Sequence, residues 1–281
     1  MFEISRILAP VVFSDNCRGA LRYAISLAAR FRAEVSVLHV LERTTYSDFD
    51  STVEMNFLEK ARHDWVHREF ENLTAGLTGR VPIAEACVDG DPATQIVKVA
   101  EKSDSNLIVM ATHGHGPFRR FLLGSVTAKV LHDTNCAVCT GAHLEHALDP
   151  KADPDHLHNV LCAVDFGRQT EAVLECATEI ASTYAARLSL LHVFAPSRDP
   201  EQQRRECVQT RQRLEGLRTS DNATSECYAS AGDVAEQVGR CAREINADLV
   251  VIGRGHIAGG GRLRSTCYAI LRESPCAVVS V

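Results

Sequence analysis

The chain alternates short apolar runs with segments whose apolar residues recur every three or four positions. The runs of strand length in the first half are residues 7–12, 35–40, 83–88, 107–111 and 137–140. The segments with helical spacing are residues 20–31, about 51–77, 91–102 and 125–132. Unbroken apolar runs are typical of strands covered on both faces. Asp91 followed by Pro92 marks the start of one helix, because Asp caps helices and Pro suits their first turn. Strict strand–helix alternation predicts an α/β fold with a parallel, doubly wound sheet.

The same pattern occurs a second time along the chain. Arg6–Ser14 resembles Asn159–Gly167 at an offset of 153 residues. Residues 37–40 match residues 190–193 at the same offset. Residues 104–110 match residues 246–252 at an offset of about 142, and residues 136–138 match residues 276–278 at an offset of 140. We therefore expect two tandem domains, each with a five-stranded parallel sheet. Their expected bounds are residues 1–142 for the first domain, 143–157 for a linker and 158–281 for the second domain.

The composition argues against nucleic-acid and membrane partners and indicates the state of the cysteines. The chain has 281 residues, a net charge of -6 and 6% aromatic residues, which argues against a nucleic-acid partner. No apolar run approaches the roughly 18 residues that span a bilayer, and the N-terminus lacks a signal-peptide pattern, so no membrane partner is expected. The eleven cysteines are an odd number set mostly among apolar residues. They indicate reduced thiols in a cytoplasmic protein.

Candidate chemistry lies in the loop from Ala111 to Ser125. Ligands of open parallel sheets bind beyond the carboxyl ends of the strands, where the strand order reverses. This loop follows the fourth strand, contains Gly114 and Gly124, and ends at the start of a helix. Free N–H groups at a helix start suit phosphate, and Arg119 and Arg120 add positive charge nearby. The loop predicts a polyphosphate site; an ordinary surface turn with a helix cap is the alternative.

The motif Ala111-x2-Gly114-x9-Gly124-Ser125 resembles that of the universal stress protein family. Nucleotide-binding members carry Gly-x2-Gly-x9-Gly-Ser/Thr after the fourth strand, and three of the four positions match here. The resemblance covers nearly the whole chain as two copies. It implies a Rossmann-like fold of the adenine nucleotide alpha hydrolase type, and a regulatory role in stress responses.

The resemblance also implies a ligand and the residues that hold it. The ligand would be ATP, with AMP or ADP as alternatives, and Mg²⁺ would accompany the phosphates. The implied binding residues are Pro10, Val11, Val12, Val40, Ala111, His113, Gly114, His115, Gly124, Ser125, Val126 and Thr127. Two positions depart from the family pattern, because Val12 replaces an Asp that holds the ribose and Ala111 replaces the first glycine.

The second copy keeps the complementary part of the motif. Asp165 stands at the ribose position and Gly253 at the first glycine, but His256 and Arg264 replace the other two glycines. We expect this copy to bind ATP poorly or not at all. As in dimers of the family, the apolar closing strands are expected to pair about a pseudo-two-fold axis, which makes the chain its own dimer. Further self-association through the long helix at residues 51–77 stays open.

Other hypotheses compete with a nucleotide-binding regulator. One is a scaffold for unidentified partner proteins that binds no nucleotide, since each copy has lost part of the motif. Another is slow ATP hydrolysis with water organised by His113 and His115, but no carboxylate pair accompanies them, so we expect no enzyme and assign no catalytic residue. Metal binding and redox chemistry are the weaker interpretations of the remaining His and Cys groups. Those groups are His63 with His67, Cys136 with Cys139, and the linker residues His143, His146, His156 and His158.

The repeated histidines His39 and His192 each follow an apolar strand. The repetition indicates a structural role near the strand end, because no nucleophile partner is visible for either.

Overall fold

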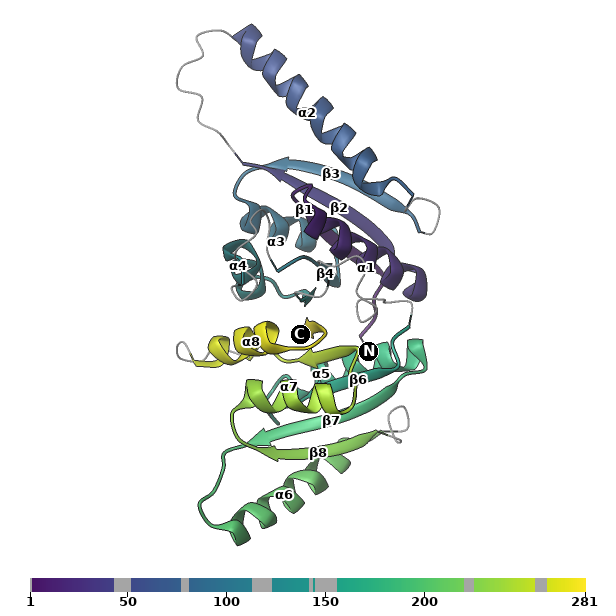
Figure 1. Ribbon diagram of the computed structural model, residues 1–281. Helices are drawn as coiled ribbons and strands as arrows, with labels where there is room; N and C mark the ends of the chain where they lie inside the picture. Colours follow the sequence, from purple (N-terminus) through teal and green to yellow (C-terminus); the bar gives the residue numbers. More distant parts are fainter. Residues whose placement is uncertain are drawn as a thin grey trace.

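The computed structural model describes residues 2–42, 52–76, 81–112, 123–141, 144, 156–219, 225–255 and 262–281. Its ten strands form one continuous sheet with helices on both faces (Figure 1). The strand order is β3-β2-β1-β4-β5-β10-β9-β6-β7-β8. The molecule is elongated, with α2 and α6 at its two far ends and the closing strands of the two copies in the middle (Figure 1).

The first copy follows the predicted order of strands and helices. Its elements are β1 Arg6–Val11, α1 Asp15–Phe31, β2 Glu34–Leu41, α2 Thr52–Thr74, β3 Ile83–Asp89, α3 Pro92–Lys102, β4 Leu107–Val109, α4 Ser125–Asp133 and β5 Ala137–Thr140. Asp91 caps α3, since its carboxylate accepts the N–H of Thr94 at 3.0 Å. Two bounds differ from the prediction: α1 begins earlier, at Asp15, and β4 ends at Val109, which leaves Met110 and Ala111 for the loop that follows.

The second copy repeats this order. Its elements are β6 Asn159–Ala163, α5 Thr170–Tyr184, β7 Arg187–Phe194, α6 Pro200–Glu215, β8 Glu226–Ala231, α7 Val234–Glu244, β9 Leu249–Ile252, α8 Arg262–Glu273 and β10 Ala277–Ser280. All strand pairs within each copy are parallel. The predicted α/β class and doubly wound topology are therefore confirmed.

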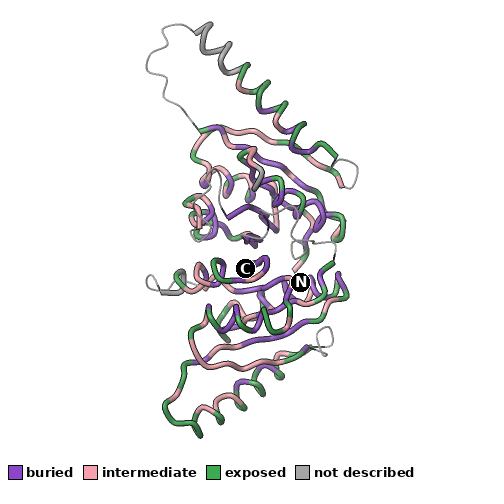
Figure 2. The backbone as a smooth tube through the Cα atoms, in the orientation of Figure 1, coloured by how far each residue is buried: buried purple, intermediate pink, exposed green. Residues whose placement is uncertain are grey.

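The two five-stranded sheets are joined through their closing strands. β5 and β10 pair antiparallel, with Val279 opposite Cys139 and Val278 opposite Thr140. This pairing is the one expected from the two apolar closing strands, and it removes both as exposed edges. The buried residues follow the strands through the middle of the molecule, and exposure rises toward α2 and α6 (Figure 2).

Side chains also join the copies on both faces of the sheet. Arg30 on α1 donates through Nε to the carbonyl of Thr183 at 3.0 Å, and its guanidinium lies 5.2 Å from the ring of Tyr184. On the other face, the hydroxyl of Tyr268 on α8 donates to the carbonyl of Ala128 on α4 at 3.0 Å. The two copies thus share contacts beyond the strand pair.

The remaining sequence hypotheses concern thiols, metals and membranes. All eleven cysteines are free thiols. Burial raises the pKa of Cys162 to about 12 and that of Cys136 to about 12. Within the described ranges, no three His, Cys, Asp or Glu side chains gather as metal ligands, and no helix is long and apolar enough to cross a membrane. His143 and His146 lie outside the described residues.

Candidate functional site

A pocket of about 140 Å³ opens at the carboxyl ends of β1, β2 and β4, where the strand order reverses. It is lined by Pro10, Val11, Val12, Cys17, Leu38, Val40, Glu42, Pro92, Ile96, Met110, Ala111, Val126 and Thr127. Seven of the residues that the sequence singled out are among these. Gly124 and Ser125 form the start of α4 beside it. His113, Gly114 and His115 lie outside the described residues.

The end of β1 is held in shape by a histidine and an aromatic side chain. Nδ1 of His39 lies 2.9 Å from the carbonyl oxygen of Val11, and because a carbonyl only accepts, Nδ1 carries the proton. Burial lowers the pKa of His39. Phe13 adopts a left-handed conformation with φ of 55° and packs its ring 4.4 Å from the His39 ring. The turn leaves the Val12 side chain 41% exposed at the pocket.

The second copy repeats this arrangement at its own strand ends. Nδ1 of His192 lies 2.7 Å from the carbonyl of Val164, and Phe166 has a φ of 57° with its ring 4.5 Å from that of His192. The predicted structural role of the two repeated histidines is therefore confirmed. Each one fixes the main chain that carries the residue at the Val12 or Asp165 position.

The start of α4 is anchored to the described part of the loop after β4. The N–H of Gly124 donates to the carbonyl of Thr112 at 2.9 Å. The hydroxyl of Thr127 donates to the carbonyl of Ala111 at 3.2 Å. Gly124 has φ of -61° and ψ of 147°, and no side chain among the described residues caps the helix. The first N–H groups of a helix have no acceptor within it, so those of Ser125 and Val126 suit an anion. Thr127 serves chiefly to position this turn.

A further contact ties α4 to α3. Nζ of Lys129 lies 2.7 Å from the Asp91 carboxylate and 3.0 Å from the hydroxyl of Thr94. The hydrogen bond from Lys129, with those from Thr94, holds the pKa of Asp91 well below its usual range. The start of α3 is thus fixed to the middle of α4.

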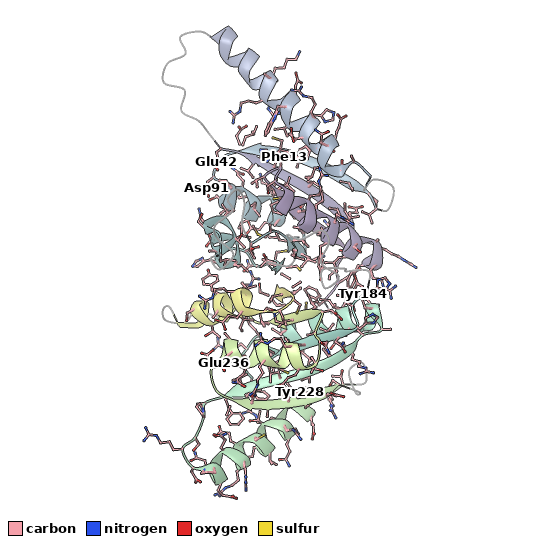
Figure 3. The ribbon with its side chains drawn as sticks, in the orientation of Figure 1. Phe13, Glu42, Asp91, Tyr184, Tyr228 and Glu236 are labelled. Atoms are coloured by element: carbon pink, nitrogen blue, oxygen red, sulfur yellow. The ribbon has the colours of Figure 1, made fainter. Side chains whose placement is uncertain are left out.

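Sequence reasoning missed six lining residues: Cys17, Leu38, Glu42, Pro92, Ile96 and Met110. Some had a signal, because Leu38 shares a strand face with Val40 and Pro92 opens a predicted helix. Glu42 directly follows β2, at the edge where ligands of such sheets bind, and position alone could have marked it. The N–H of Gly90 donates to the carbonyl of Leu41 at 2.9 Å. This hydrogen bond brings the next residues, Glu42 and Asp91, to the same edge of the first copy (Figure 3).

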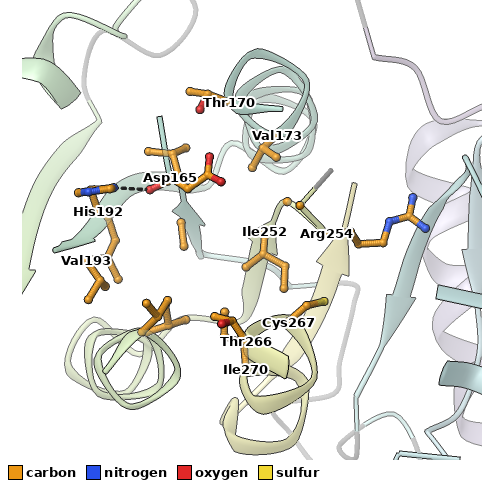
Figure 4. A pocket seen from close by; sticks show the side chains of 17 residues that line it. Asp165, Thr170, Val173, His192, Val193, Ile252, Arg254, Thr266, Cys267 and Ile270 are labelled. Atoms are coloured by element: carbon orange, nitrogen blue, oxygen red, sulfur yellow. Dashed lines mark hydrogen bonds between the residues drawn. The ribbon is translucent and has the colours of Figure 1, made fainter. Parts of the chain in front are cut away.

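The second copy has an equivalent pocket of about 170 Å³, lined in part by Asp165, His192, Gly253 and Thr266 (Figure 4). The Asp165 carboxylate is exposed and accepts the N–H of Gly167 at 2.7 Å. The helix start differs from that of the first copy. α8 begins at Arg262, so Ser265 is its fourth residue, whereas Ser125 is the first residue of α4. His256 and the side chain of Arg264 lie outside the described part of the structure.

Arg254 follows Gly253 and lines this pocket as well, but its side chain extends toward the first copy (Figure 4). Its guanidinium donates to three carbonyls at the end of α4 and beyond: Leu131 at 3.3 Å, Thr134 at 3.0 Å and Cys136 at 2.7 Å. Burial lowers the pKa of Arg254. The position equivalent to Thr112 has therefore become a contact between the copies.

Comparisons with known proteins agree with this architecture. The sequence model of the universal stress protein family matches residues 3–140 and again residues 156–281. A universal stress protein of Methanothermobacter thermautotrophicus is 31% identical over 144 residues, which are 49% of this chain and 96% of that protein. Universal stress protein MJ0531 of Methanocaldococcus jannaschii is 28% identical over 134 residues, which are 47% of this chain and 79% of that protein.

Solved structures show the same fold over the whole chain. A universal stress protein from Archaeoglobus fulgidus superimposes with a TM-score of 0.71 at 21% identity, covering 99% of this chain and 96% of that one. The functionally unknown protein PA1789 of Pseudomonas aeruginosa gives a TM-score of 0.63 at 17% identity, covering 99% and 92%. With two matches to the family model and ten strands in two equivalent halves, the chain belongs to the universal stress protein family as a tandem, two-domain member.

Proposed function

We propose that this protein is a stress-response regulator that binds an adenine nucleotide in its first domain. The ligand is ATP, or AMP or ADP, with Mg²⁺ accompanying the phosphates. The observation that carries the proposal is the pocket in which apolar side chains face the uncapped start of α4. The proposal places the protein in the cytoplasm, with unidentified proteins as further partners and neither nucleic acid nor a membrane among them.

The two sides of the pocket suit the two parts of a nucleotide. Leu38, Val40 and Ile96 present apolar surface of the kind that takes a flat purine ring. The first amides of α4 and the positive end of its dipole suit phosphate. Val12 offers no side-chain acceptor, and a lost neutral hydrogen bond costs about 0.5–1.5 kcal/mol, so affinity falls by up to roughly tenfold. The proposal is therefore a nucleotide site of reduced affinity.

The second domain has a structural role in this proposal. Its helix α8 begins three residues before Ser265, which moves the free amides away from the position that Ser125 has in α4. Arg254 lines its own pocket, but its guanidinium bonds to carbonyls at and beyond the end of α4 in the first domain. Both features favour a domain that supports the first one over a second ATP site.

Isothermal titration of ATP with two variants at Gly124 tests the proposal. Wild-type protein should bind about one ATP per chain. Gly124→Asp places a carboxylate at the helix start, where it caps α4 but repels phosphate, so ATP binding should fall at least tenfold while α4 becomes more stable. Gly124→Asn is the matched control, because it caps without charge and should retain most of the affinity.

Two outcomes contradict the proposal. One is the absence of binding heat with wild-type protein, which favours the scaffold hypothesis. The other is equal ATP affinity in the Asp and Asn variants, which would mean that phosphate does not meet the start of α4.

A further inference from the structure

Each of the two equivalent pockets has one carboxylate among its described lining residues, but the two carboxylates follow different strands. In the first domain it is Glu42, directly after β2; in the second it is Asp165, which follows β6. The strand register allows a direct comparison of the two domains. In the first domain Val11 pairs with His39. In the second domain Ala163 pairs with Leu191, so the residues that follow them, Val164 and His192, correspond to Val11 and His39. Val12 thus corresponds to Asp165, and Glu42 corresponds to Ala195. The first domain therefore has its pocket carboxylate after its second strand, whereas the second domain has it after its first strand.

The position of Glu42 relative to α4 decides which part of a ligand it meets. In the sheet, β1 lies between β2 and β4, and the register places the end of β4 level with Val37, four residues before the end of β2. The ends of β2 and β4 are therefore roughly 16 Å apart. α4 follows β4 and brings the positive end of its dipole to that side of the pocket. Glu42 brings a negative charge to the other side, and Arg62 holds its main chain by donating to the Glu42 carbonyl at 3.1 Å. The pocket therefore offers N–H donors at the start of α4 and, on the other side, a carboxylate that accepts hydrogen bonds.

A nucleotide has a matching polarity. With its phosphates at the start of α4, the ribose and then the base extend across β1 toward β2. We infer that Glu42 recognises the exocyclic amine of the purine base in the first-domain pocket. The inference rests on the proposed nucleotide site and specifies which base it takes.

The chemistry of the carboxylate explains the selectivity. An ionised carboxylate only accepts hydrogen bonds, and the 6-amino group of adenine donates two. Hypoxanthine carries a 6-oxo group at the same place, so its lone pairs would face those of Glu42. Because Glu42 is exposed, the expected preference for the amine is moderate, roughly three- to tenfold in affinity.

Titration of ATP and ITP into full-length protein and its variants tests the inference. Wild-type protein should bind ATP roughly three- to tenfold more tightly than ITP. Glu42→Ala should bind both nucleotides about equally. Glu42→Gln should also narrow the preference, because its amide can turn to donate to the 6-oxo group. Glu34→Gln is the matched control, since Glu34 is an exposed residue at the opposite end of β2, and it should keep the wild-type preference.

The outcomes separate this inference from the function on which it rests. If wild-type protein binds ATP and ITP equally, or if Glu42→Ala keeps the preference for ATP, the role of Glu42 is wrong while the nucleotide site stands. If neither nucleotide binds to wild-type protein, the nucleotide site and the role of Glu42 are both wrong.

Discussion

Replacing Arg254 with Met tests how strongly the second domain supports the first. The variant keeps an unbranched side chain of similar reach but removes the charge and all five N–H donors. Three carbonyls, those of Leu131, Thr134 and Cys136, lose their donor. The α4 dipole also loses a positive charge at its C-terminal end.

The magnitude follows from two opposing effects. Hydrogen bonds to charged groups contribute about 1.5–3 kcal/mol each, which would give more than 4 kcal/mol if the three carbonyls became isolated. However, Arg254 also lines a cleft of about 530 Å³ with Thr134 and Gln169, through which water can reach the freed carbonyls. In addition, folding of the variant no longer buries a charged guanidinium, which costs free energy in the wild type. We expect a loss of about 2 kcal/mol in the free energy of unfolding.

Urea unfolding followed by Trp65 fluorescence measures this loss. Trp65 is the single tryptophan and lies on α2 in the first domain, with its ring 5.5 Å from that of Phe13. Its signal therefore reports on the domain that does not contain Arg254. Arg240→Met is the matched control, because Arg240 is exposed on α7 and bonds within its own domain to Ser230 at 2.9 Å and Glu244 at 3.7 Å. It should cost less than about 0.5 kcal/mol.

The expected result is a lower urea midpoint in the Trp65 signal for Arg254→Met, at an unchanged slope, and almost no shift for Arg240→Met. Coincident transitions for wild type and Arg254→Met would refute the argument that the second domain stabilises the first through this side chain.

Three further predictions concern single residues. Val12→Asp supplies the missing acceptor and should raise ATP affinity by up to about tenfold in a calorimetric titration; weaker binding would contradict the site. Burial lowers the pKa of His39, so below about pH 6.5 the unfolded chain binds more protons than the folded one. The stability advantage of wild type over His39→Asn should therefore shrink as pH falls from 7 to 5, and a constant advantage in urea unfolding would contradict this. Burial raises the pKa of Cys162 to about 12 and that of Cys176 well above its usual range. At pH 8, mass mapping after alkylation should show both unlabelled in the native protein and labelled in urea; native labelling faster than at half-buried Cys207 would be inconsistent with their burial.

The sequence predicts those features that are set locally or repeated. The strand–helix alternation appears twice, and Asp91 caps α3 because Asp-Pro before a helical pattern is a local signal. The role of His39 was accessible because His192 repeats it. The pairing of β5 with β10 followed from two apolar strands that each needed a neighbour.

Features that depend on distant contacts were not accessible in the same way. Arg254 lies in a loop whose counterpart in the first domain borders the proposed nucleotide pocket, yet its side chain bonds to residues about 120 positions earlier in the chain. The start of α8 at Arg262 could not be read from Ser265, because the motif would make Ser265 the first residue of the helix whereas it is the fourth. Glu42 is a different case, because its position directly after β2 was visible in the sequence but lies outside the glycine motif.

The most direct test of the nucleotide site in the first domain is a map of backbone amide shifts by NMR during titration with ATP. The first-domain site predicts the largest shifts at Val12, Val40, Ala111, Ser125 and Val126, with small shifts at the equivalent second-domain positions Asp165 and Gly253. Shifts confined to the second domain, or no shifts at millimolar ATP, would contradict it.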